Sequence, residues 1–222
     1  MSGDAVRKLT AASGLTATAL IVVGAALLPG DVPGFDATPE QVVRWTLDDR
    51  RTLLVASVLV AVGFALLIAF YAGLRSLLSR AEGAPALLST IGYGAFLVVV
   101  AMGLVAVGVL QTQTFVALDG DPATVKVLHE ARLIVTNLSD IPTILSAAAI
   151  GIVMLRTRFP ARWAGWLSIS VAVAHALGVI ALARTGFFSP TGGSTLVGPV
   201  VILVWFVAVS LRLLSVPRHV RV

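Results

Sequence analysis

Six long apolar stretches occupy most of the 222 residues of this chain. Each is about as long as the 17–25 apolar residues that an α-helix needs to cross the hydrocarbon core of a bilayer. Only 12% of the residues are charged, whereas soluble domains carry roughly 25%. The sequence therefore predicts an all-α, integral membrane six-helix bundle that forms a single transmembrane domain over 1–222. The predicted spans are 9–28, 52–74, 86–110, 133–155, 163–183 and 195–214.

The charges between the spans predict that both termini are cytoplasmic. Most arginine and lysine residues then lie on the inner side and most acidic residues on the outer side. This distribution is expected because short cytoplasmic loops are enriched in basic residues. The basic Arg7-Lys8 flank also resembles the start of a signal peptide, but the apolar run that follows exceeds a signal core of roughly 7–15 residues. We therefore expect 9–28 to be retained as a span.

Composition and motifs exclude several kinds of chemistry. The chain has no cysteine, which excludes disulfides, thiolate metal sites and cysteine nucleophiles. It has no HExxH, Walker or GxSxG motif, so we expect no catalytic residues, no metal, no cofactor and no enzymatic activity. The net charge of +5 is explained by topology and contact with anionic lipids, so no nucleic-acid partner is expected. The expected partners are membrane lipids and either a second copy or a membrane complex.

Two polar segments carry helix-start signals. Thr38-Pro39-Glu40-Gln41 combines a threonine cap, a proline at the first helical position and a glutamine three residues after the cap. It predicts a short amphipathic external helix before the second span. Asp121-Pro122 offers a similar entry and predicts one helix from Pro122 to about Thr157.

Asp140 is the only carboxylate inside a predicted span. An ionisable group in hydrocarbon is costly and is therefore rare unless it is paired, hydrated or functional. Pro142 follows closely and is expected to disrupt the helix beside Asp140 because proline lacks a backbone donor. On a helix, Asp140 shares a polar and small face with other residues that should pack against neighbouring helices. These are Thr136, Asn137, Thr143, Ala147 and Gly151.

His175 is the predicted partner of Asp140. It lies about 20 Å from the cytoplasmic boundary at Arg162, and Asp140 lies about 24 Å from the same boundary, at 1.5 Å per helical residue. The fourth and fifth spans are joined by a short turn and should be adjacent. His175 also shares a face with Ser168. The candidate binding residues are Asp140, His175, Asn137, Thr136, Thr143 and Ser168.

Two interpretations of the pair remain open. Asp140 and His175 either line a polar, proton-responsive binding site or form an interhelical hydrogen bond that fixes packing. The first predicts a small transport-like or accessory membrane protein. The second predicts a structural subunit of a membrane complex or homo-oligomer, and a membrane enzyme acting on a lipid is a further alternative.

Other polar residues are expected near the membrane surfaces. His129 and Arg132 are expected to contact headgroups on the outer side, with Gln113 forming part of a polar vestibule above Asp140. Tyr71 is expected at the cytoplasmic interface, where aromatic residues are enriched.

Three segments carry a resemblance to a known group of proteins. They are Leu74-Arg75-Ser76-Leu77-Leu78-Ser79-Arg80-Ala81-Glu82-Gly83, the stretch Arg156-Thr157-Arg158-Phe159-Pro160-Ala161-Arg162-Trp163-Ala164-Gly165-Trp166-Leu167, and a Pro-Gly-Asp loop before the second span. Together they resemble uncharacterised multi-pass membrane proteins of actinobacteria, close to a bacterial domain-of-unknown-function family. The resemblance implies a helical bundle in the bacterial plasma membrane and supplies no catalytic residues.

Overall fold

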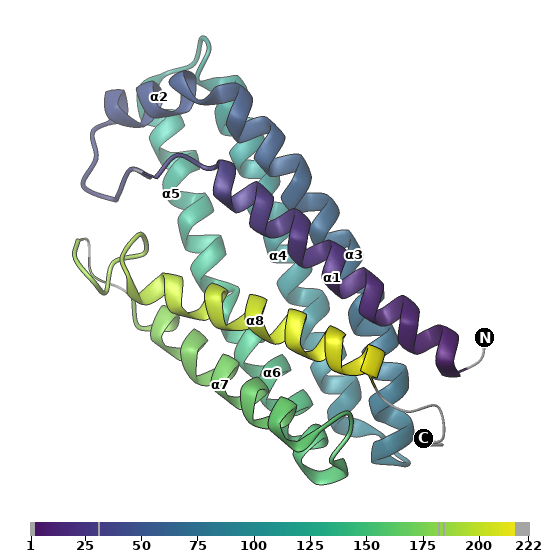
Figure 1. Ribbon diagram of the computed structural model, residues 1–222. Helices are drawn as coiled ribbons and strands as arrows, with labels where there is room; N and C mark the ends of the chain where they lie inside the picture. The colour runs from purple at the N-terminus through teal and green to yellow at the C-terminus, as the bar shows by residue number, and fades with distance from the viewer. Residues whose placement is uncertain (1–2, 31, 182, 184, 216–222) are drawn as a thin grey trace.

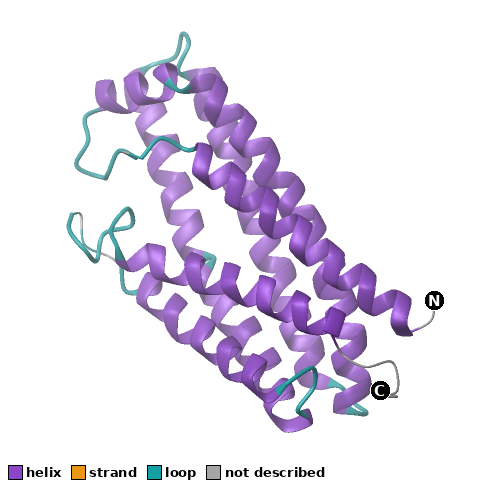
Figure 2. Ribbon diagram, viewed as in Figure 1, coloured by secondary structure: helices purple, strands orange, loops and turns teal. Residues whose placement is uncertain are grey.

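The computed structural model describes residues 3–30, 32–181, 183 and 185–215, and these residues fold into helices and connecting loops, without strands (Figures 1 and 2). This confirms the all-α prediction. The helices are α1 (Gly3–Leu27), α2 (Pro39–Asp48), α3 (Arg50–Glu82), α4 (Leu87–Val116), α5 (Pro122–Leu138), α6 (Asp140–Thr157), α7 (Arg162–Val179) and α8 (Ser194–Ser215).

Five helical segments among the described residues are long and apolar enough to cross a membrane. They are α1, α3, α4, the combined α5–α6 segment and α8. The predicted span 163–183 corresponds to α7, which ends at Val179 and is not among the five. Its 18 residues include Arg162 and His175, which lower its apolar character, and Leu182 lies outside the described residues. The six-span count therefore stays a prediction.

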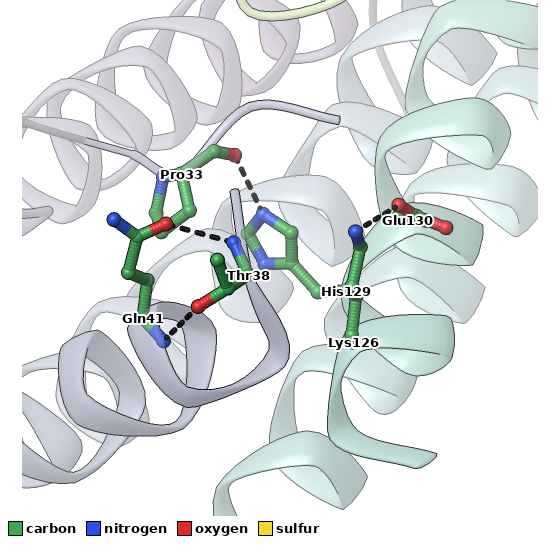
Figure 3. Close-up of polar contacts among 6 residues, drawn as sticks. All are labelled: Pro33, Thr38, Gln41, Lys126, His129 and Glu130. Atoms are coloured by element: carbon green, nitrogen blue, oxygen red, sulfur yellow. Dashed lines mark hydrogen bonds and ion pairs between the residues drawn. The ribbon is translucent and has the colours of Figure 1, made fainter. Parts of the chain in front are cut away.

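Local capping signals predicted two helix starts correctly. At the start of α2, the Thr38 hydroxyl accepts from the Gln41 backbone N–H at 3.3 Å, and the Gln41 side chain accepts from the Thr38 backbone at 2.7 Å (Figure 3). At the start of α5, the Asp121 carboxylate accepts from the Thr124 backbone at 3.1 Å. These three contacts satisfy backbone donors at the starts of the two helices.

An aromatic cluster joins α3, α4 and α8. The rings of Tyr71 and Phe96 stack with their centroids 3.4 Å apart, and Phe70 packs edge-on against Trp205 and Phe206. Tyr71 is only 2% exposed, so the prediction that its ring faces the membrane interface as a belt residue is wrong. Its rotation on α3 turns the ring toward α4 and α8, where it contributes to the core.

The two ends of the bundle differ in what they carry. The start of α1, the end of α8, the α3–α4 turn and the α6–α7 turn lie at one end, which we call the terminal end (Figure 1). The α2 helix, the α4–α5 turn and the α7–α8 loop lie at the opposite end, called the α2 end (Figure 1). The α5–α6 segment runs from the α2 end toward the terminal end, and α7 returns beside α6.

Candidate functional site

The candidate site is centred on the junction between α5 and α6. Ser139 separates the two helices and Asp140 is the first residue of α6. Pro142 has no N–H to donate to the carbonyl of Leu138, one turn earlier, so the backbone ladder loses a hydrogen bond at this point. The ladder continues on either side through Ser139 N–H to Val135 and Thr143 N–H to Ser139, both at 3.2 Å. The predicted disruption beside Asp140 is confirmed.

Asp140 and His175 form a direct hydrogen bond between α6 and α7. The distance from Nδ1 of His175 to Oδ1 of Asp140 is 2.6 Å. Both side chains are largely buried, with 7% of His175 and 13% of Asp140 exposed. The contact predicted from their similar depth and the short α6–α7 turn is confirmed, whereas a binding role for the pair stays a prediction.

The second nitrogen of His175 has no partner among the described residues. When Asp140 is ionised its carboxylate only accepts, and Nδ1 of His175 then donates the hydrogen bond. Nε2 of the same ring is buried and makes no hydrogen bond. A buried polar atom without a partner costs about 1–3 kcal/mol. Nδ1 of His175 is therefore satisfied by Asp140, whereas Nε2 of His175 is free to form a hydrogen bond or bind a proton.

Two glycines make room for the pair. A Cβ atom added at Gly178 of α7 would overlap Oδ2 of Asp140 and lie 2.9 Å from Cγ of the same carboxylate. A Cβ atom added at Gly198 of α8 would lie 2.8 Å from Nδ1 of His175. The site therefore depends on a glycine from each of two neighbouring helices, α7 and α8.

The small and polar faces of α6 and α7 pack closely, as the sequence predicted. The Ser168 hydroxyl of α7 donates to the Ala147 carbonyl of α6 at 2.9 Å. A Cβ atom added at Gly165 would lie 3.0 Å from the Gly151 carbonyl oxygen. The two backbones therefore approach through small residues, which sets the geometry that brings Asp140 to His175.

The remaining predicted site residues face different surroundings. The Thr143 hydroxyl is buried and donates to the Ser139 carbonyl at 2.8 Å. The Thr136 hydroxyl donates to the Arg132 carbonyl at 2.9 Å. Asn137 lines a pocket with Gly178. The structure thus brings Asp140 and His175 together, places Asn137 at an adjacent pocket, and directs the hydroxyls of Thr136, Thr143 and Ser168 to backbone carbonyls.

The pocket beside the pair has a volume of about 270 Å³ and mainly apolar walls. Gly178 both lines this pocket and abuts Asp140. Ile134 and Ile141 extend the wall along α5 and α6, and Phe35 comes from the loop before α2. Pockets that bind small molecules combine apolar walls with a few placed polar groups. The pocket beside the pair has Asn137 in its wall, and the Asp140 carboxylate lies against Gly178 of the same wall.

His129 and Gln113 belong to a separate buried cluster at the α2 end. His129 is fully buried, and its Nε2 lies 2.8 Å from the Pro33 carbonyl oxygen (Figure 3). The Gln113 amide donates to the Thr46 hydroxyl at 2.7 Å, and the Trp45 ring packs edge-on against His129. The expectation of headgroup contact for His129 is wrong because the loop before α2 folds back over α5 and covers it.

Replacing His129 with phenylalanine should destabilise the protein by about 1–3 kcal/mol. The change removes the donor to the Pro33 carbonyl and leaves that buried oxygen and the Gln113 amide with fewer partners. Unfolding in mixed micelles of increasing SDS fraction measures the loss. Glu130→Gln is the matched control one residue away, because it breaks only the Lys126–Glu130 pair at 3.6 Å (Figure 3), which as a surface pair is worth about 0–1 kcal/mol. An equal loss of stability in His129→Phe and Glu130→Gln would contradict the role of His129 in holding the loop before α2 against α5.

Known proteins do not supply a role for the site. Comparison of the chain with protein-family models, with curated proteins and with solved structures finds no match. Its function is therefore inferred from the geometry of the Asp140–His175 pair and the pocket beside it.

Proposed function

We propose that this chain is a multi-pass protein of the bacterial plasma membrane, with six spans and both termini in the cytoplasm. The span proposed in addition to the five long apolar segments is α7, fifth in chain order, which packs between α6 and α8. More of the described basic residues lie at the terminal end than toward the α2 end, which supports this orientation because the positive-inside rule places basic segments in the cytoplasm. Those at the terminal end are Arg7, Lys8, Arg75, Arg80, Arg156, Arg158, Arg162 and Arg212; Arg218 and Arg221, also assigned to the cytoplasm, lie outside the described residues. Those toward the α2 end are Arg44, Arg50, Arg51, Lys126 and Arg132.

Its proposed function is non-enzymatic and transport-like, with proton exchange at Asp140 and His175. One observation carries this proposal: a buried carboxylate–imidazole pair at 2.6 Å, placed at a helix interruption and next to an apolar pocket. Intramembrane carboxylates and histidines of this kind relay protons in pumps and transporters. A small, mainly apolar substrate in the pocket would contact Gly178 and Asn137. Its binding would depend on the protonation of Asp140, which lies against Gly178.

The test is proton flux into liposomes that carry the protein and a trapped pH-sensitive dye. Wild type should conduct protons above the level of empty liposomes under an imposed pH gradient, and Asp140→Asn should reduce the flux to that level. The carboxamide introduced by Asp140→Asn keeps an acceptor for His175, so the unfolding free energy of this variant should change by no more than about 1 kcal/mol. Asp119→Asn, which changes an exposed carboxylate at the α2 end, is the control and should keep wild-type flux.

Two results would reject the transport proposal: absence of proton flux with the wild-type protein, and wild-type proton flux with Asp140→Asn. If Asp140→Asn keeps wild-type flux but loses stability, the pair is a packing contact.

A structural role for the pair is the second candidate, and the interhelical hydrogen bonds favour it. Besides Asp140–His175, the Ser146 hydroxyl donates to the Gly92 carbonyl at 2.7 Å and Ser168 donates to Ala147. Hydrogen bonds of this kind hold transmembrane helices together, at about 0.6–2 kcal/mol each. In this case the chain would serve as a structural subunit, with a second copy or a membrane complex as its partner.

A further inference from the structure

A second pocket lies on the other side of α5, away from the Asp140–His175 pocket. It has a volume of about 200 Å³ and is open on one side. Its walls come from α3, α4, the junction of α5 and α6, and Leu28 just after α1. Most of the lining is hydrocarbon, including Val60 and Phe64 of α3 and Val107 of α4. Thr136 and Ser139 lie in its wall, whereas Asn137 and Ile141 line the first pocket.

Arg132 is the cation of this pocket. It lines the wall, and its Nε and Nη2 atoms are buried without a hydrogen-bond partner in the part of the chain that the structure describes. None of the residues lining the pocket is acidic. Glu130, the nearest acid along α5, pairs instead with Lys126 at 3.6 Å. Nε and Nη2 of Arg132 thus face the pocket, and no acidic residue in the described part of the chain pairs with them; contact of Arg132 with a headgroup stays a prediction.

The hydroxyl and amide groups around the pocket do not accept hydrogen bonds from Nε or Nη2 of Arg132. The Ser57 hydroxyl donates to the Leu54 carbonyl and accepts from the Gln111 amide at 3.0 Å. The Ser139 hydroxyl donates to the Thr136 carbonyl at 2.6 Å. Since these groups already have partners, the free donors of the pocket are on the guanidinium. A buried and unpaired charge is costly, so an external anion at this position would be strongly favoured.

We propose that this pocket binds an anionic amphiphile whose head is a carboxylate or phosphate. Nε–H and Nη2–H lie on one edge of the guanidinium and together fit two oxygens of such a head. The hydrocarbon chain lies along Val60, Phe64 and Val107 and leaves through the open side of the pocket. The proposal concerns a different pocket from the Asp140–His175 site and does not rest on the transport proposal.

The test is native mass spectrometry and thermal stabilisation of the full chain in a neutral detergent. One arm adds oleate, with oleyl alcohol as the uncharged analogue. The other adds phosphatidylglycerol, with phosphatidylcholine as the lipid without net charge. Wild type should bind one equivalent of oleate or phosphatidylglycerol and should bind the matched analogue at least about ten-fold more weakly, because the analogue lacks a net anionic head for the charge-assisted pair.

Two variants remove the site in different ways. Arg132→Gln should weaken binding of the anion about ten-fold or more. Val107→Phe keeps the arginine but fills the space for the hydrocarbon chain, and it should abolish binding. Arg51→Gln is the control, because Arg51 is exposed at the same end and does not line the pocket.

The pattern of results decides both the proposal and the source of the ligand. Binding of oleate alone identifies a free fatty acid, binding of phosphatidylglycerol alone identifies a lipid headgroup, and binding of both means that the site recognises the oxyanion. Absence of binding in both arms, equal binding of the uncharged analogues, or unchanged binding in Arg132→Gln or Val107→Phe would overturn the proposal. None of these results depends on Asp140, so a failed proton-flux experiment leaves this test unaffected.

Discussion

Replacing His175 with leucine is expected to destabilise the protein by about 3 kcal/mol or more, because a buried charged group left without its hydrogen-bond partner costs more than the roughly 1–3 kcal/mol of a neutral group. Leucine fills similar space but leaves the Asp140 carboxylate, only 13% exposed, without the hydrogen bond at 2.6 Å. The carboxylate must then either stay charged without a partner or take up a proton. Unfolding in mixed micelles of increasing SDS fraction measures the change.

The double variant Asp140→Leu/His175→Leu separates the cost of an unpaired charge from the contribution of the pair. Replacing both partners of a buried pair by apolar residues is often neutral or stabilising. We therefore expect the double variant to recover most of the stability lost in His175→Leu while conducting no protons. A double variant as unstable as His175→Leu would show that the unpaired carboxylate is not what destabilises the single variant, which contradicts the coupling that their contact implies.

Replacing Gly178 with alanine is expected to destabilise the protein by about 1–3 kcal/mol through overpacking. The added methyl group would occupy the position of Oδ2 of Asp140 and force the carboxylate away from His175. Stability and proton flux should therefore fall together, although neither titratable residue has been changed. Unfolding in mixed micelles and the liposome assay measure the two effects.

Gly108→Ala is the matched control for Gly178→Ala. Gly108 lies within α4, and a Cβ atom added there meets nothing within 4 Å. Alanine in a helix is favoured over glycine by roughly 0.5–1 kcal/mol, so this variant should be as stable as wild type or more stable. If Gly178→Ala behaves like Gly108→Ala, the carboxylate has room to move and the tight fit around Asp140 is not a requirement of the site.

The sequence predicted the Asp140–His175 contact because two local features were sufficient. The short connection between α6 and α7 makes these helices antiparallel neighbours, and the rise of a helix then sets the depth of each side chain. The start of α2 was predictable for a similar reason, since Thr38 and Gln41 satisfy each other within one turn. Contacts of this kind involve residues that are close in the chain or are joined by a short turn.

The positions of His129 and Arg132 could not be predicted in this way. His129 is buried by Pro33, which lies 96 residues earlier in the chain, and no local pattern indicates that the loop before α2 returns to α5. Arg132 faces a pocket whose other walls belong to α3 and α4. From the sequence alone, both residues lie near the end of a predicted span, where contact with headgroups is the ordinary expectation.

The sequence by itself determined that the chain is all-α and apolar enough for a membrane, where α2 and α5 begin, and that Asp140 and His175 lie close enough along their helices to meet. These properties follow from composition, capping and helical rise, which are local. The tertiary structure alone decided that Tyr71 and His129 are buried, that Gly178 and Gly198 enclose the pair, and that Nε and Nη2 of Arg132 face a pocket whose described lining has no acidic residue. The rotation of each helix about its axis decides these features, and that rotation is set by the packing of all its neighbours together.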